Sequence, residues 1–241
     1  MNNLESTILF EDDEIIVIDK PAGLLSIPDR FNKLLPNALD FLGSIYGEVY
    51  TVHRLDRDTG GVMVFARTAL SHKSLNDQFE NREVTKLYHA VISGKLMKDD
   101  LAIDIPLLTD PAGKGGVIPS ARGKESLTEI RVLERFRIAT LLECNLVTGR
   151  QHQLRAHVAA IGHPLLVDPH YGKADAFYLS MLKRRYNIPK DVVEKPIIKR
   201  ITMQSKSIEF THPIKNERVR FDTEYPLDFE VLLKSLRKYG A

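Results

Sequence analysis

The stretch Thr51-Val-His-Arg-Leu-Asp-Arg-Asp-Thr-Gly-Gly-Val-Met-Val-Phe-Ala66 places six polar side chains between two apolar runs. The β-branched residue Val52 and the run over residues 62–66 predict strands, and Gly60 and Gly61 separate the second strand from the polar cluster. We therefore expect the cluster on a loop that a buried scaffold holds in place, where proteins commonly carry reactive side chains. A solvated turn with arginine–aspartate pairs is the alternative, because surface ion pairs are common.

Composition limits the class of protein. The chain has 241 residues, enough for one large domain or two fused subdomains, and its 43% hydrophobic content is typical of a folded protein. A net charge of only +2 means that any nucleic-acid site must come from local clustering of positive charge. Cys144 is the only cysteine, which excludes an internal disulfide, and we expect it to be buried. No apolar segment approaches the roughly 18 residues of a membrane span, so a cytoplasmic protein is expected.

Residues 84–92 predict a second informative strand. Its period of two places Lys86, Tyr88 and Ala90 on one face. A tyrosine combines an apolar ring with a hydroxyl at its tip, so Lys86 and Tyr88 are a candidate functional pair. The alternative is a packed aromatic ring beside a solvated lysine.

Residues 148–164 predict a helix. Leu154, Val158 and Ile161 recur at helical spacing, Thr148 can cap the start, and Gly162 supplies the stop. Arg155 then belongs to a charged row along the flank of the apolar stripe. The histidines of this stretch lack the spacing that presents two imidazoles to one metal ion, so we expect no metal site.

Shorter patterns predict the rest of the chain. We expect hairpins at residues 8–18, 127–147 and 207–221, and helices at 37–46, 68–79 and 227–236. Asn37 begins the first of these helices and Gly47 ends it, while Thr68 caps the second.

Three motifs, in order, resemble those of the RluA family of RNA pseudouridine synthases. They are His-Arg-Leu-Asp-x-x-Thr-x-Gly at 53–61, Val-x-Lys-x-Tyr-x-Ala-x-x-x-Gly at 84–94, and Thr-Gly-Arg-x-His-Gln-Leu-Arg-x-His at 148–157. Lys-Pro-Ala-Gly at 20–23 and Asp-Pro-His-Tyr-Gly at 168–172 extend the resemblance over nearly the whole chain. Departures such as Gly60, where serine is usual, affect substrate choice rather than the reaction.

The resemblance implies an α+β fold: a pseudouridine synthase core with a long, bent, mixed and mostly antiparallel sheet, flanking helices and a central RNA-binding cleft. Residues 1–241 would form a single catalytic domain of two fused subdomains, divided at roughly 95–125, without the S4-like N-terminal module that some relatives carry. Residues 173–200 have no counterpart in the shortest relatives. They are either an insert that contacts RNA or a solvated basic face.

The implied reaction isomerises uridine to pseudouridine in structured RNA, with ribosomal RNA favoured and transfer RNA also open. Asp56 is the implied catalytic carboxylate, acting as nucleophile or base on a flipped-out uridine. Arg155 would pair with Asp56 and keep it ionised, Tyr88 would pack on the uracil, and Leu154 would supply an apolar wall. No metal or organic cofactor is required, and we expect a monomer. The candidate RNA contacts are Lys20, His53, Arg54, Arg57, Thr59, Lys86, Arg150, His152 and Gln153.

Two other functions compete with this interpretation. A glycoside hydrolase would use Asp56 and Asp58 as a carboxylate pair, but it gives no role to Tyr88 or Arg155. A catalytically inactive RNA-binding module would need only the basic residues. Replacing Asp56 separates the enzyme from the module, because only the enzyme needs that carboxylate.

Overall fold

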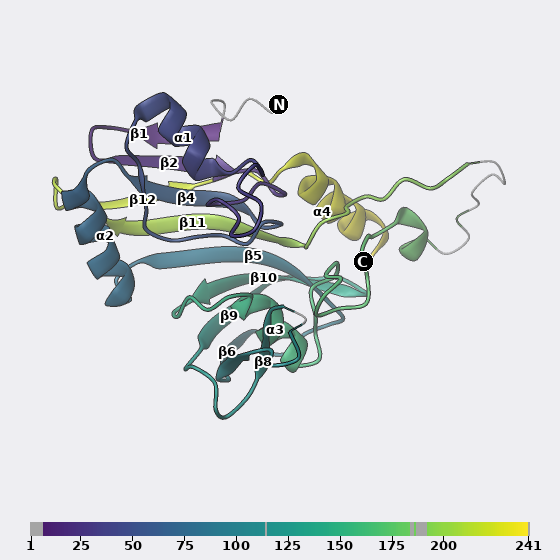
Figure 1. Ribbon diagram of the computed structural model, residues 1–241. Helices are drawn as coiled ribbons and strands as arrows, with labels where there is room; N and C mark the ends of the chain where they lie inside the picture. The colour runs from purple at the N-terminus through teal and green to yellow at the C-terminus, as the bar shows by residue number, and fades with distance from the viewer. Residues whose placement is uncertain (1–6, 114, 184–185, 187–191, 241) are drawn as a thin grey trace. The chain divides into compact units, whose positions relative to one another are not determined.

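The computed structural model describes residues 7–113, 115–183, 186 and 192–240. The fold is α+β, as expected (Figure 1). The chain divides into two compact units. Unit 1 runs to Leu87 and includes Gln204–Glu224, whereas unit 2 comprises Tyr88–Met203 and the chain from Tyr225 onward. The division falls inside strand β5 (Thr85–Ser93) and so lies earlier than the expected boundary at residues 95–125.

Unit 1 is built on a mixed sheet: β4 (Gly60–Ala66) and β11 (Met203–Thr211) pair in parallel, whereas β2 (Ile15–Lys20) pairs antiparallel with β4 and with β1 (Ile8–Glu11). Strands β2 and β4 are almost completely buried, as expected of continuous apolar runs in the interior of a sheet. The order is β1, β2, β4, β11, with β3 (Tyr50–Thr51) paired to β4 and β12 (Arg218–Asp222) to β11.

The helices of unit 1 begin and end where local side chains predict. In α1 (Ala38–Tyr46), the side chain of Asn37 accepts a hydrogen bond from the backbone N–H of Asp40, and Gly47 follows with φ of 79°. In α2 (Ala69–Glu80), the side chain of Thr68 accepts from the N–H of Ser71. Both contacts satisfy a backbone donor that a helix start leaves unpaired. Helix α2 packs against β3 and β4.

The core of unit 1 combines apolar side chains from β2, β4, α2 and β11. The hairpin of β11 and β12, which is distant in sequence, completes this core. Its buried members are Ile15, Val17, Val62, Val64, Ala66, Leu75, Val84, Ile208 and Phe210.

Unit 2 combines further antiparallel strands with helices, as far as the structure describes it. After β5 the strand order is β10 (Ala139–Leu146), β9 (Leu127–Arg135), β6 (Asp100–Asp104), and a separate hairpin joins β7 (Leu107–Thr109) to β8 (Val117–Pro119). Helix α3 (Gln153–Ala160) packs against β8 and β9, and α4 (Leu227–Tyr239) is the last helix. Cys144 is fully buried in β10, as expected, and burial raises the pKa of its thiol.

Part of the described segment at residues 173–200 packs into the core of unit 2. Phe177, Leu182 and Ile198 are buried together with apolar residues of α4, and a short 3-10 helix occupies Leu179–Met181. These three residues therefore stabilise the unit, whereas Val192 and Val193 of the same segment are exposed, and an RNA contact by the segment stays a prediction. The expected RNA contact through the basic run at 183–186 lies partly outside the described residues.

Several expected boundaries differ from the structure, among them the end of α4, which lies at Tyr239 and not at residue 236. Strand β3 ends at Thr51, so Val52 is already in the following loop. Helix α3 begins at Gln153 and not near Thr148, because the Thr148 hydroxyl donates to the Gln153 side chain and accepts from the N–H of Leu127. Residues 153–158 are all buried, so the expected charged row on the helix flank is absent there. No helix in the described part of the chain has the length and apolarity needed to cross a membrane.

Candidate active site

The loop that carries Asp56 is anchored immediately before the carboxylate. Ser26 Oγ accepts a hydrogen bond from the backbone N–H of Leu55 at 3.1 Å and donates one to the Leu55 carbonyl at 2.8 Å. Both residues are buried. One serine hydroxyl therefore satisfies both backbone groups of the residue that precedes Asp56.

A second anchor follows the carboxylate. The Arg57 carbonyl accepts from the backbone N–H of Gly23 at 2.8 Å and from Lys20 Nζ at 3.2 Å. The backbone N–H of Thr59 donates to the Asp56 carbonyl at 3.1 Å, which closes a turn. Asp56 thus lies between two fixed residues, and its side chain is partly exposed.

Lys20 has a structural position that the sequence did not predict. It is fully buried, and its ammonium group also donates to the carbonyls of Pro21 and Leu24, at 3.1 and 2.7 Å. A buried amine needs hydrogen-bond partners in place of water, and these carbonyl oxygens supply them. Lys20 therefore supports the Asp56 loop and does not fit the expected phosphate contact.

His53 also differs from the expected RNA contact. Its Nε2 accepts the backbone N–H of Val64 at 3.1 Å, and its ring stacks on Phe79 at 4.9 Å. Burial, together with the positive charge of Lys86, lowers the pKa of His53 to about 3. The ring is therefore a neutral acceptor that fixes the loop to β4.

The other candidates on unit 1 divide into buried and exposed residues. Thr59 is buried, and its hydroxyl has no hydrogen-bond partner among the residues that the structure describes. Arg54 and Arg57 are exposed, and Arg57 Nε donates to the Gly23 carbonyl. Burial lowers the pKa of Lys86, whose ammonium lies 5.7 Å from the centre of the Phe79 ring. The two arginines remain accessible to a polyanion.

Unit 2 holds Arg155 in a buried ion pair with Asp168. Arg155 Nε and Nη2 donate to the two carboxylate oxygens at 2.8 and 2.9 Å, and the guanidinium lies 5.2 Å from the centre of the Tyr171 ring. Burial alone would raise the pKa of Asp168, but Arg155 and the backbone N–H groups of Tyr171 and His170 hold that pKa below its ordinary value. This planar, two-bond arrangement fixes the orientation of the guanidinium.

The pairing of Arg155 with Asp168 was missed in the sequence. Asp168 was visible as the first residue of Asp-Pro-His-Tyr-Gly, but nothing in the spacing connects it to an arginine on the helix. The expected pairing of Arg155 with Asp56 stays a prediction. Tyr88, at the first position of unit 2, is 6% exposed.

Helix α3 is fixed by buried polar groups. The Gln153 side chain accepts from the Thr148 hydroxyl and the Arg150 N–H, and donates to the Leu127 carbonyl and the Thr128 hydroxyl. All four hydrogen-bonding positions of this amide are thus occupied inside the protein, so Gln153 does not fit the expected RNA contact.

The remaining candidates on unit 2 have different exposures. Leu154 is fully buried, and its role as an apolar wall of the uracil site stays a prediction. Arg150 is exposed, and its Nε donates to the Glu125 carbonyl. His152 is half-buried, with Nδ1 3.2 Å from the Tyr171 hydroxyl, and it adopts a left-handed backbone with φ of 50°.

Solved structures identify the class of fold. Human RNA Pseudouridylate Synthase Domain Containing 4 matches with a TM-score of 0.71 and 22% sequence identity, over 97% of this chain and 94% of that chain. Human RNA Pseudouridylate Synthase Domain Containing 1 matches with a TM-score of 0.68 and 22% identity, over 96% and 94%. The fold is therefore that of pseudouridine synthase domains.

Sequence comparison identifies the family. The sequence model described as RNA pseudouridylate synthase matches residues 14–160. Ribosomal large subunit pseudouridine synthase D of Xanthomonas campestris is 36% identical over 244 residues, covering 97% of this chain and 70% of the relative. Dual-specificity RNA pseudouridine synthase RluA of Vibrio vulnificus is 39% identical over 179 residues, covering 72% of each. The chain belongs to the RNA pseudouridylate synthase family, and it is an isomerase that acts on uridine in RNA.

Proposed function

We propose that the chain isomerises uridine in large-subunit ribosomal RNA and that Asp56 is its catalytic carboxylate. The observation that carries the assignment of Asp56 is the double anchoring of its loop, through Ser26 on one side and Lys20 on the other. A carboxylate that is fixed before substrate binds loses little freedom in the transition state. Several relatives are named ribosomal large subunit pseudouridine synthases, which supports the choice of RNA.

The reaction breaks the bond between N1 of uracil and C1′ of ribose and rejoins the base through C5. An ionised Asp56 either attacks C1′ or takes a proton from the neighbouring C2′. The detached uracil must turn without leaving, and the proton on C5 must be removed after the new bond forms. We assign the packing on uracil and the movement of that proton to Tyr88.

Arg155 keeps Asp56 ionised in this proposal. A neighbouring guanidinium favours the charged form of a carboxylic acid. Asp168 sets the plane of Arg155 through two hydrogen bonds and is therefore a positioning residue. A uridine stacked in a helix is out of reach of any carboxylate, so the target nucleotide is flipped out.

Exposure separates the RNA contacts from the supporting residues. Arg54, Arg57 and Arg150 are exposed and are assigned to the phosphate backbone or to the stack that the flipped base leaves. Lys20 and Gln153 form hydrogen bonds inside the protein and are assigned to support. We further propose that the protein acts as a cytoplasmic monomer.

Transfer RNA is the second candidate substrate. The relative from Vibrio vulnificus is named a dual-specificity RNA pseudouridine synthase, so a second class of RNA is worth testing. Both RNAs therefore belong in the same experiment.

Mapping pseudouridines in cells that lack the chain tests the choice of substrate. We expect one or more pseudouridines to disappear from large-subunit ribosomal RNA and to return when the wild-type gene is restored. If pseudouridines disappeared only from transfer RNA, transfer RNA would replace ribosomal RNA as the proposed substrate. An unchanged map in both RNAs would contradict the proposed substrate.

A further inference from the structure

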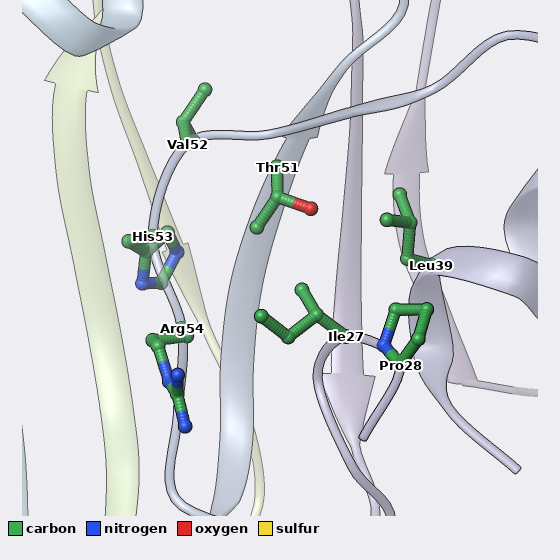
Figure 2. A pocket seen from close by; sticks show the side chains of 7 residues that line it. All are labelled: Ile27, Pro28, Leu39, Thr51, Val52, His53 and Arg54. Atoms are coloured by element: carbon green, nitrogen blue, oxygen red, sulfur yellow. The ribbon is translucent and has the colours of Figure 1, made fainter. Parts of the chain in front are cut away.

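A hollow of about 460 Å³ lies in unit 1 beside the loop that carries Asp56. Figure 2 shows Ile27 and Pro28 on one side of it and His53 and Arg54 on the other. We refer to this hollow as the loop pocket. Its volume is in the range of pockets that bind small organic groups.

The lining of the loop pocket suits a flat ring with apolar faces. Ile27, Pro28, Leu39 and Val52 contribute apolar surface, and no residue that lines the pocket is acidic. Thr51 also lines the pocket, and its hydroxyl is buried without a hydrogen-bond partner among the described residues. Splayed RNA bases are commonly held in this way, by packing on flat or apolar side chains with few hydrogen bonds.

Position along the chain favours RNA over a partner protein as the occupant. Arg54 lines the loop pocket, and Asp56 is only two residues away, so their Cα atoms are at most about 7 Å apart. A nucleotide bound at Asp56 therefore brings its neighbours in the strand close to the pocket. Arg54 also places an exposed positive charge at the rim, where the phosphate of such a neighbour would lie.

We propose that the loop pocket binds the base of a nucleotide adjacent to the target uridine. This inference rests on the proposed role of Asp56. Base packing in the pocket would hold the RNA strand in position while the target is flipped out, and it would make the identity of a flanking nucleotide part of substrate choice.

Abasic RNA combined with a pocket variant tests the proposal. The probe is a hairpin cut from whichever RNA the mapping identifies, with one flanking nucleotide at a time made abasic. Leu39→Glu places a charge in the pocket, and Ile45→Glu places the same charge elsewhere on α1 as the control. We expect one abasic position to raise KM about tenfold for the wild type and for Ile45→Glu, with kcat little changed.

The rise in KM that the abasic position causes must be absent in the pocket variant Leu39→Glu. We expect Leu39→Glu to raise KM about tenfold on intact RNA and to show no further loss on the abasic RNA, because the contact is already absent. Thermal unfolding checks that both variants fold, and Ile27→Ala repeats the test with a milder change. An unchanged KM on every abasic RNA, or an abasic loss that persists in Leu39→Glu and Ile27→Ala, would overturn the proposal. A KM on intact RNA that Leu39→Glu does not change would also overturn the proposal. The pocket would then be a candidate site for a partner protein.

Failure of the proposed catalytic role gives a different result. In that case Asp56→Asn keeps its activity, whatever the abasic RNAs show. The KM comparison reports on the pocket, and the activity of Asp56→Asn reports on the carboxylate.

Discussion

Three polar side chains form hydrogen bonds to backbone groups of the protein, and none of these bonds requires a substrate. They belong to Lys20, Ser26 and His53. Each contacts the Asp56 loop or the strand beside it: the Arg57 carbonyl, both backbone groups of Leu55, and the N–H of Val64. A buried polar group that loses its partner is costly, so each contact favours a single loop conformation. At the residue scale, the carboxylate depends on these supporting residues for its position.

His53 should remain neutral well below its ordinary pKa of 6.5, because burial and the charge of Lys86 lower that pKa to about 3. Between these values the unfolded chain binds a proton at His53 and the folded chain does not. The contribution of His53 to stability is therefore complete above about pH 6.5 and declines as the pH falls toward 3. Nitrogen NMR of the ring should show a proton on Nδ1 only, from pH 8 to about 4. A titration of His53 near pH 6.5 would contradict the structure.

Asp168→Asn should destabilise the protein strongly. The change leaves the guanidinium of Arg155, which is 6% exposed, without its paired charge, and such losses cost about 3–5 kcal/mol. Glu230→Gln is the control, because it breaks the exposed pair with Lys234 on α4, which should be worth less than about 0.5 kcal/mol. Urea unfolding measures both. If Asp168→Asn lowered the free energy of unfolding as little as Glu230→Gln does, Asp168 would not hold Arg155.

Helix boundaries were predictable from the sequence where the residues that set them lie within one turn of the helix end. The caps Asn37 and Thr68 and the stop at Gly47 act within one turn of their helices, so sequence alone locates those boundaries. The start of α3 was not predictable, because the Thr148 hydroxyl also accepts from Leu127 on β9. A contact between distant segments overrode a local capping pattern.

The same distinction applies to the site. The motif around Asp56 and its position on a loop follow from local sequence. One carbonyl that accepts from the buried Lys20 ammonium belongs to a residue 37 positions away, and no spacing rule predicts that contact. The partner of Arg155 lies 13 residues on, beyond the end of α3. The proposed catalytic residue was thus visible in the sequence, whereas much of its support was not.

Strands β4 and β11 can pair only because residue 61 is glycine. Gly61 has φ of 116°, and a Cβ atom there would lie 2.1 Å from the Ser205 carbonyl oxygen. We expect Gly61→Ala to cost at least about 3 kcal/mol, since it combines an unfavourable backbone angle with a clash that only separation of the strands relieves.

The matched control for Gly61→Ala is Gly43→Ala in α1. Nothing lies within 4 Å of a Cβ atom at Gly43, and alanine is the better helix former by about 1 kcal/mol. The control should therefore raise the free energy of unfolding in chemical denaturation. A tolerated Gly61→Ala would contradict the close parallel pairing.

At the scale of the whole molecule, the proposed catalytic residues come from both units. Asp56 belongs to unit 1, and Tyr88 and Arg155 belong to unit 2. The chain leaves unit 1, returns to it for β11 and β12, and ends in unit 2 with α4. Each unit has its own apolar core, so damage to either core should reduce activity even when the other stays folded.

The most direct test of the central claim is the rate of pseudouridine formation by Asp56→Asn beside Asp58→Asn, under single-turnover conditions with saturating enzyme. Asparagine keeps the shape of the side chain and removes its charge, and Asp58 is an exposed carboxylate of the same loop. We predict that Asp56→Asn loses at least about 1,000-fold in rate while still binding RNA, and that Asp58→Asn stays within a few-fold of the wild type. Activity retained by Asp56→Asn, or equal losses in the two variants, would contradict the account.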